Sequence, residues 1–153
     1  MASAQAACVL CQPTVFPLLW QDEHCRVVCL QDADYPAYCR VEWLSHVAEM
    51  TDLAPTARAH LMKVVFAVES ALREVIQPDK INLASLGNKT PHLHWHVLPR
   101  FVDDKHFPNS HWGAPCRTGQ ARPLDAATLA RLQHTLQAHI QCALQSPSDT
   151  HDD

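Results

Sequence analysis

Glycine is scarce in this chain of 153 residues, which contains only 3. It therefore has no glycine-rich loop of the kind that cradles phosphates in P-loop or dinucleotide-binding proteins. Basic residues are also few, with 12 Lys and Arg against 16 Asp and Glu and a formal net charge of -4. A nucleic-acid backbone or an anionic membrane surface needs a basic field to hold it. We therefore expect neither nucleic acid nor a membrane as a partner.

Long apolar segments are absent too. No apolar run is long enough to span a bilayer, and residues 1–7 lack the basic start and apolar core of a secretory signal peptide. These absences predict a cytoplasmic protein. The 7 cysteines are an odd number in a chain large enough to fold without cross-links, which argues against a disulfide framework. We expect reduced thiols, with two of them as candidate metal ligands.

The apolar content of 47% suits one compact domain, predicted over residues 1–144, followed by a polar tail over 145–153. Alternation and turn residues indicate short strands, and apolar residues at helical spacing indicate two helices. The predicted elements are strands over 18–20, 25–30 and 38–43, a central helix over 55–76, strands over 80–86 and 93–101, and a last helix over 126–144. This order predicts an α+β fold with a five-stranded antiparallel sheet.

Histidine is the residue type in excess, with 11 in the chain, and residues 91–100 concentrate it. In this segment histidine alternates with apolar residues, as in a strand whose successive side chains point to opposite faces. His92, His94 and His96 are therefore predicted to share one face, while the apolar residues between them anchor the strand. Neighbouring imidazoles cannot all be protonated at low cost, so at least one is expected to be neutral and reactive.

Two chemistries use such a face. A neutral imidazole can attack phosphorus and form a covalent intermediate, while its other ring nitrogen is held by a hydrogen bond. The same three histidines can instead bind a divalent metal, as in known zinc enzymes. The spacing of the histidines does not decide between these chemistries.

The wider pattern carries a resemblance. His92-Leu93-His94-Trp95-His96-Val97-Leu98, preceded by a strand and then Gly87 and Asn88, resembles the signature of the histidine triad superfamily. The order of the predicted elements over residues 8–101 is also similar to that family. The resemblance implies an α+β homodimer, paired through the central helix region. It also implies binding of nucleoside phosphates and cleavage at the α-phosphorus through a nucleotidyl-histidine, with no cofactor required for catalysis.

The expected function is thus that of a nucleotide hydrolase or transferase. Its expected substrates are nucleoside phosphoramidates, dinucleoside polyphosphates or related conjugates. Two alternatives stay open: a metal-dependent hydrolase that uses the histidine strand as ligands, and a nucleotide-binding module without turnover.

Site residues follow from the resemblance by position. His94 matches the nucleophile, His96 matches the histidine that contacts the phosphate or leaving group, and His92 matches the one that orients the nucleophile. Asn88 stands where the family usually has Gln, whose amide reaches the phosphate or leaving-group oxygen. Asn82 matches a strand position near the ribose and phosphate.

The resemblance implies an apolar nucleobase pocket lined by the early strands, around Leu30, Tyr38 and Trp43. By residue type alone, Tyr38 and Trp43 are instead expected to be core and interface residues. A closer likeness is to a bacterial branch related in outline to diadenosine polyphosphate hydrolases. This branch has an Asp-Asp-x-His-Phe-Pro stretch and a later Trp, which here are residues 103–108 and Trp112. The surrounding residues 102–122 show no periodicity and are predicted to form an ordered or semi-ordered loop, a kind of segment that often shapes a site.

Cys8 and Cys11 have the spacing of half a tetrahedral zinc site. Some histidine triad proteins resemble this arrangement and add a histidine after the third strand and one from the triad strand, which here are His46 and His92. Two ordinary thiols fit the spacing equally well. Any zinc bound by these four residues is expected to be structural.

Overall fold

The computed structural model describes residues 7–145, so the predicted tail lies outside the described residues apart from Gln145. The elements follow the predicted order, and their ends differ from the predictions by at most two residues. Two short 3-10 turns are added. In chain order the elements are η1 (Val9–Cys11), β1 (Leu18–Gln21), β2 (Cys25–Cys29), β3 (Cys39–Trp43), η2 (Met50–Asp52), α2 (Pro55–Val75), β4 (Lys80–Ala84), β5 (His94–Arg100) and α3 (Ala126–Gln145).

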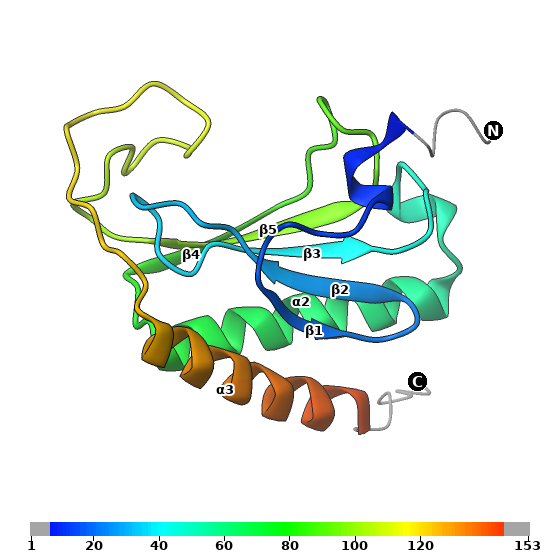
Figure 1. Ribbon diagram of the computed structural model, residues 1–153. Helices are drawn as coiled ribbons and strands as arrows, with labels where there is room; N and C mark the ends of the chain where they lie inside the picture. The colour runs from blue at the N-terminus through cyan, green and yellow to red at the C-terminus, as the bar shows by residue number, and fades with distance from the viewer. Residues whose placement is uncertain (1–6, 146–153) are drawn as a thin grey trace, which may run out of the picture.

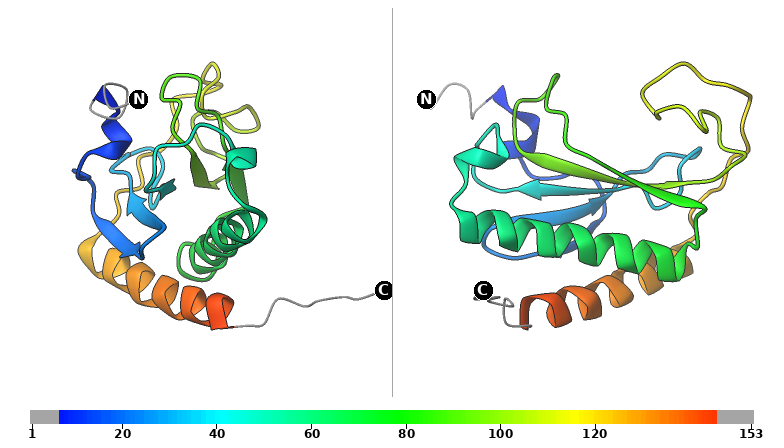
Figure 2. Two further views of the ribbon diagram at one scale, coloured as in Figure 1. Left: turned by 90° about the vertical axis from the view of Figure 1, so that its right-hand side faces the viewer. Right: turned by 180° about the vertical axis from the view of Figure 1, so that it is seen from behind.

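The five strands form one sheet in the order β1-β2-β3-β5-β4, and every neighbouring pair is antiparallel. Both long helices lie against the same face of this sheet, with α2 next to α3 (Figures 1 and 2). The predicted α+β fold with a five-stranded antiparallel sheet is confirmed.

The core lies between the sheet and the helices. The buried residues of α2, among them Leu61, Val64 and Val68, recur at helical spacing and so form one apolar stripe. This stripe packs against the sheet face that carries Val41 and Val97. Helix α3 adds Leu132, Leu136 and Ile140 to the same core. One face of the sheet is thereby fully occupied by helices.

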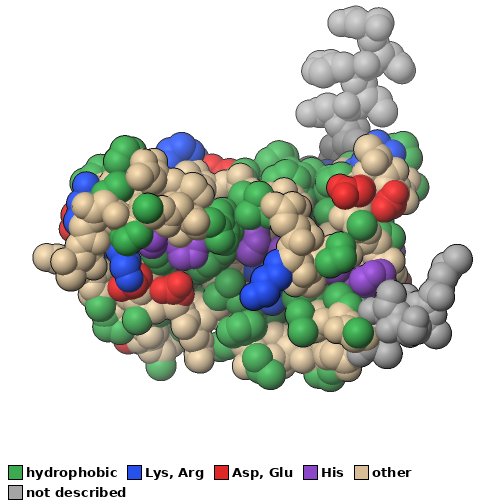
Figure 3. All heavy atoms as spheres, turned by 90° about the horizontal axis from the view of Figure 1, so that it is seen from above, with side chains coloured by type: hydrophobic (Ala, Val, Ile, Leu, Met, Phe, Trp, Pro, Cys, Tyr) green, Lys and Arg blue, Asp and Glu red, His purple; other side chains and the backbone are tan. Residues whose placement is uncertain are grey.

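The opposite face is left to loops. Three segments rise over it: the chain before β1, the connection between β4 and β5, and the long connection between β5 and α3 (Figure 1). The space-filling view of this face shows histidine side chains recessed between these segments (Figure 3). No helix within residues 7–145 has the length and apolar character needed to cross a membrane.

The packing of α3 predicts a stability difference between two leucines. Leu136 is 1% exposed in the core, whereas Leu86 is 50% exposed in the β4–β5 connection. We expect Leu136→Ala to lower the free energy of unfolding by about 2–5 kcal/mol, because it leaves a cavity. Leu86→Ala should change it by no more than about 0.5 kcal/mol. Urea denaturation of both variants measures this difference, and equal losses would contradict the packing described here.

Candidate active site

Strand β5 places His94 and His96 on the sheet face that the helices do not cover. In the register with β3, His94 lies opposite Glu42 and His96 lies opposite Arg40. The apolar partners on the other side of the two strands, Val41 and Trp95, also lie opposite each other. The alternation of the strand therefore separates an apolar helix-facing side from a charged, imidazole-bearing side.

One hydrogen bond fixes the tautomer of His94. Its Nδ1 lies 2.6 Å from the backbone oxygen of His92, and a carbonyl oxygen only accepts. Nδ1 must therefore carry the proton, which leaves the lone pair of a neutral ring on Nε2. Burial lowers the pKa of His94, and the neighbouring charge of Arg40 acts in the same direction. The ring is thus held as a neutral imidazole with a defined nucleophilic nitrogen.

His96 continues this hydrogen-bond chain. Its Nε2 lies 3.1 Å from Nε2 of His94, which has no proton to give, so His96 must donate. The other nitrogen of a neutral His96, Nδ1, then accepts from the Tyr38 hydroxyl at 2.7 Å. Burial lowers the pKa of His96 to about 3, with added contributions from His94 and Arg40. The hydrogen bonds run in one direction, from Tyr38 through His96 to the unprotonated Nε2 of His94.

His92 departs from the predicted shared face, because β5 begins only at His94. The Nε2 of His92 donates to the backbone oxygen of Trp43 at 2.5 Å. Its Nδ1 lies 3.4 Å from the sulfur of Cys8 and 3.4 Å from that of Cys11. The ring is therefore committed away from His94 and His96, and the three rings do not point at one common ligand position.

Four potential metal ligands meet beside η1, at what we call the thiol corner: Cys8, Cys11, His46 and His92. Their ligand atoms all lie within 4.8 Å of one another. The Nδ1 of His46 lies 3.3 Å from the sulfur of Cys11. Two thiols and two imidazoles are a donor set that suits tetrahedral zinc. The bond from His92 to Trp43 also leaves Nδ1 of His92 unprotonated, as a metal ligand requires. The four residues therefore fit a zinc ion.

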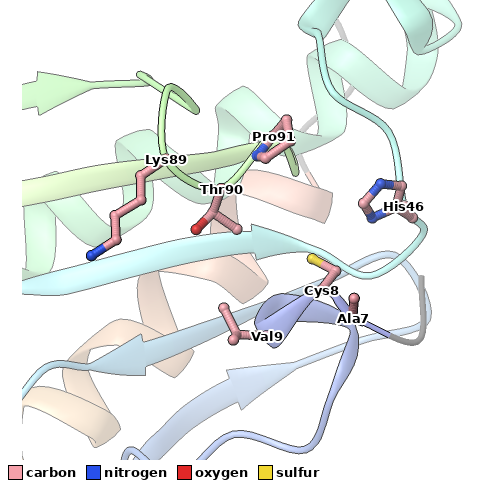
Figure 4. A pocket seen from close by; sticks show the side chains of 7 residues that line it. All are labelled: Ala7, Cys8, Val9, His46, Lys89, Thr90 and Pro91. Carbon is pink, nitrogen blue, oxygen red and sulfur yellow. The ribbon is translucent and has the colours of Figure 1, made fainter. Parts of the chain in front are cut away.

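A cavity of about 620 Å³ adjoins this corner. Figure 4 shows Cys8 and His46 on one side of it, with Thr90 and Pro91 from the β4–β5 connection on another. Lys89, from the same connection, also lines it. The cavity thus lies beside both the thiol corner and the loop that leads into the histidine strand.

Comparison with known proteins agrees with this geometry. The family model of the HIT domain matches residues 17–103. The chain belongs to the HIT, or histidine triad, family. The fold is therefore one whose members bind small nucleotide ligands and are generally nucleotide hydrolases or transferases.

Solved structures show the same family fold. A histidine triad protein from Bradyrhizobium japonicum is 28% identical, with 82% of this chain and 90% of that chain covered and a TM-score of 0.66. One from Marinobacter aquaeolei VT8 is 24% identical, with 84% and 90% covered and a TM-score of 0.65. A Zn-bound histidine triad family protein from Mycobacterium smegmatis is 19% identical, with 90% and 99% covered and a TM-score of 0.60. No curated protein matches the chain.

The two asparagines carried over from the HIT signature lie outside the histidine strand. Asn88 is exposed in the β4–β5 connection, and its side chain makes no hydrogen bond within residues 7–145. Asn82 lies on β4, and its amide oxygen accepts a hydrogen bond from Arg100 at 2.7 Å. Its oxygen thus already accepts one of the two hydrogen bonds it can take, and its contact with a substrate stays a prediction.

The expected nucleobase residues divide between the two sheet faces. Tyr38 and Leu30 pack together beside the histidine strand, and Tyr38 has the additional role of hydrogen-bonding His96. Trp43 lies on the helix-facing side, where it is buried in the core and stacks on His24. The side chain of Trp43 is therefore separated from His94 by the sheet, and only its backbone oxygen reaches the site. We accordingly leave Trp43 out of the proposed pocket.

The connection after β5 is held in place by bonds to its acidic residues. Burial alone would raise the pKa of Asp104, but Arg100 and three backbone amides bond to its carboxylate and hold that pKa far below its usual range. Asp103 pairs with Arg122. The loop brings the ring of Trp112 to 5.0 Å from that of His96. Its two acidic residues are therefore paired with arginines, Asp104 with Arg100 of β5 and Asp103 with Arg122, while an aromatic ring reaches the site.

The sequence analysis missed a charged cluster beneath the histidines. Arg26, Arg40 and Glu42 lie on the histidine-bearing face of β2 and β3, and both arginines bond to Glu42. A signal was present: Arg40 and Glu42 alternate with apolar residues in a strand that otherwise reads as core. Such polar residues at a period of two mark a second, functional face of a buried strand.

The buried His96 predicts how stability depends on pH. Its pKa is about 3 in the folded protein, against 6.5 for an unperturbed histidine, so only the unfolded chain gains a proton between these values. The stabilising contribution is therefore complete above about pH 6.5 and is lost as the pH falls toward 3. We expect the wild type to lose more stability than His96→Gln between about pH 7.5 and about pH 5 in urea denaturation. The pKa values of His92 and His94 are lowered as well, so the pH dependence of stability in His96→Gln should be weaker than in the wild type without vanishing. Parallel profiles of stability against pH for the two proteins would contradict the role given to His96.

Proposed function

We propose that this HIT protein transfers or hydrolyses nucleotidyl groups through a covalent bond to His94. The observation that carries the proposal is the hydrogen bond from Nδ1 of His94 to the backbone oxygen of His92, which leaves Nε2 as the only available lone pair of the ring. A nucleophile held in one tautomer by its other nitrogen is the arrangement that covalent catalysis by histidine needs. The resemblance assigns the same role to His94.

In the proposed reaction, the lone pair of His94 Nε2 forms a bond to the α-phosphorus while the bond from phosphorus to the leaving group breaks. The leaving group departs with that electron pair, and the N–H of His96 donates a hydrogen bond to it. Water then attacks phosphorus, the N–P bond breaks with its electrons returning to His94, and the proton of water passes to solvent. An acceptor other than water would make the second step a transfer.

The neutrality of His96 bears on the choice of leaving group. A polyphosphate is a stable anion and needs only a hydrogen bond as it leaves, whereas an amine must receive a proton. Burial holds the pKa of His96 at about 3, so the free site presents a hydrogen-bond donor there and not an acid. We therefore favour dinucleoside polyphosphates and similar conjugates over phosphoramidates as substrates, in keeping with the resemblance to diadenosine polyphosphate hydrolases.

Intact mass spectrometry tests the nucleophile directly. We expect the wild type, mixed with diadenosine tetraphosphate and quenched without acid, to gain the mass of one adenylyl group, and His94→Ala to gain none. An adenosine phosphoramidate tested in parallel should give slower adduct formation. His134→Ala is the matched control, because His134 is exposed on α3.

Other outcomes would support the rival functions. Turnover that persists in His94→Ala and requires added metal would support the metal-dependent hydrolase. Binding of AMP by a wild type that forms no adduct and shows no turnover would support a nucleotide-binding module. Either result would remove His94 as the nucleophile.

We also propose that Cys8, Cys11, His46 and His92 hold a structural zinc ion, which when bound supplies a cross-link and no chemistry. Its position supports this, since it would join the N-terminal segment to the residue whose backbone oxygen orients His94. The predicted homodimer, paired through the central helix region, also stays a proposal. On α2, Phe66 is 52% exposed and gives that helix an apolar surface residue for such a contact.

Metal analysis tests whether the thiol corner binds zinc. We expect purified wild type to contain one zinc per chain and Cys8→Ser to contain little. Chelation should lower the melting temperature by about 5–10 °C, which corresponds to roughly 2.7 kcal/mol at a hundredfold excess of metal over its Kd. Cys116→Ser is the matched control because Cys116 is an exposed thiol remote from these four residues. Metal content that is equal in Cys8→Ser and the wild type would contradict the site.

A further inference from the structure

Glu42 lies beneath the histidine pair with two arginines bonded to it. Its side chain is 0% exposed, and each carboxylate oxygen is taken by one arginine. Nε of Arg26 donates to Oε2 at 2.6 Å, and Nε of Arg40 donates to Oε1 at 2.6 Å. Two guanidinium groups against one carboxylate leave the cluster with a net positive charge.

The two arginines are not equivalent. Arg26 is also bonded through Nη2 to the backbone oxygens of Leu10 and Gln12, so its donors are largely committed to the protein. Among the described residues Arg40 hydrogen-bonds only to Glu42, through Nε and Nη2, and its guanidinium lies over the Phe16 ring at 5.7 Å from the centroid. Its side chain is twice as exposed as that of Arg26, at 18% against 9%. The other nitrogen of its guanidinium, Nη1, is therefore left for another partner.

The position of Arg40 in the sheet places its charge beside the two histidines. Arg40 lies directly opposite His96 in the sheet, and Glu42, which holds it, lies opposite His94. Arg40 and Arg26 also border a cavity of about 380 Å³ that extends toward Phe16. The charge of Arg40 acts on both imidazoles, because it contributes to lowering the pKa of His94 and of His96.

We propose that Arg40 is a substrate-binding residue whose guanidinium, oriented by Glu42, contacts the anionic phosphoryl oxygens of the nucleotide at His94. The inference rests on the proposed function and adds to it a residue that the HIT signature does not include. Arginine suits this task, because its charge is permanent and its donors match the oxygens of a phosphate. The developing negative charge at phosphorus would meet a fixed positive charge in a partly buried setting, where electrostatic interactions are strong.

A purely structural role explains the cluster less well. A single arginine already neutralises a buried carboxylate, and Arg26 does so while its Nη2 is bonded to two backbone oxygens. A second cation in a partly buried position adds a desolvation cost that neutralising Glu42 does not require. That cost is offset if an anionic ligand completes the cluster.

The experiment compares binding of AMP and of adenosine, which differ only in the phosphate, by NMR titration. We expect Arg40→Gln to weaken AMP binding by about tenfold to a hundredfold and to leave adenosine binding within about twofold of wild type. Arg40→Lys keeps the charge but not the fork of donors, so AMP binding should fall between the two. Arg73→Gln is the matched control, because it removes the same charge from an exposed position on α2.

Each outcome is informative. Arg40→Gln that binds AMP as tightly as wild type, or that loses AMP and adenosine in equal measure, would overturn the inference. A wild type that binds neither AMP nor adenosine would instead overturn the proposed function. Thermal unfolding establishes that each variant is folded. Should Arg40→Gln fail to fold, Arg40→Lys takes its place: a loss of AMP affinity without a loss of adenosine affinity would support the inference. Wild-type AMP affinity in Arg40→Lys would then overturn the inference.

Discussion

His92 links the two halves of the site through three separate atoms. Its backbone oxygen accepts a hydrogen bond from Nδ1 of His94, and this bond leaves the nucleophilic lone pair on Nε2. Its ring donates through Nε2 to the oxygen of Trp43 and presents Nδ1 to Cys8 and Cys11. Any disturbance of the thiol corner therefore acts on the orientation of His94 through a single residue, without a direct contact between that corner and the reacting atoms.

The sheet imposes the second constraint. Because side chains alternate across a strand, the helices on one face require apolar residues at every second position and leave the intervening positions to the site. Strand β3 shows the result, with Val41 in the core and both Arg40 and Glu42 beneath the histidines. A carboxylate buried in this way must be paired within the face, and Glu42 is paired with two arginines, which leaves one positive charge in excess there.

Local patterns predicted much of this arrangement from the sequence. The alternation at His94 and His96 and the helical spacing in α2 and α3 are periodic signals, and the structure follows them. His92 departs because the chain has not yet entered β5, and a period-two pattern does not reveal where pairing begins. Trp43 lies in the core with Val41 because it alternates with Arg40 and Glu42 along β3, a placement that the period of two itself indicates. The bond from Tyr38 to His96 joins residues 58 positions apart, a contact that no local pattern encodes.

The long connection after β5 shows how an irregular segment becomes a fixed wall of the site. Arg100, the last residue of β5, donates hydrogen bonds to the carboxylate of Asp104 through two nitrogens. The same carboxylate accepts hydrogen bonds from three backbone amides, those of Phe101, His106 and Phe107. A buried carboxylate with this many donors tolerates neither loss of charge nor rotation. The loop is consequently tied to the strand that carries the histidines, so Trp112 and His96 keep their relative positions without help from regular secondary structure.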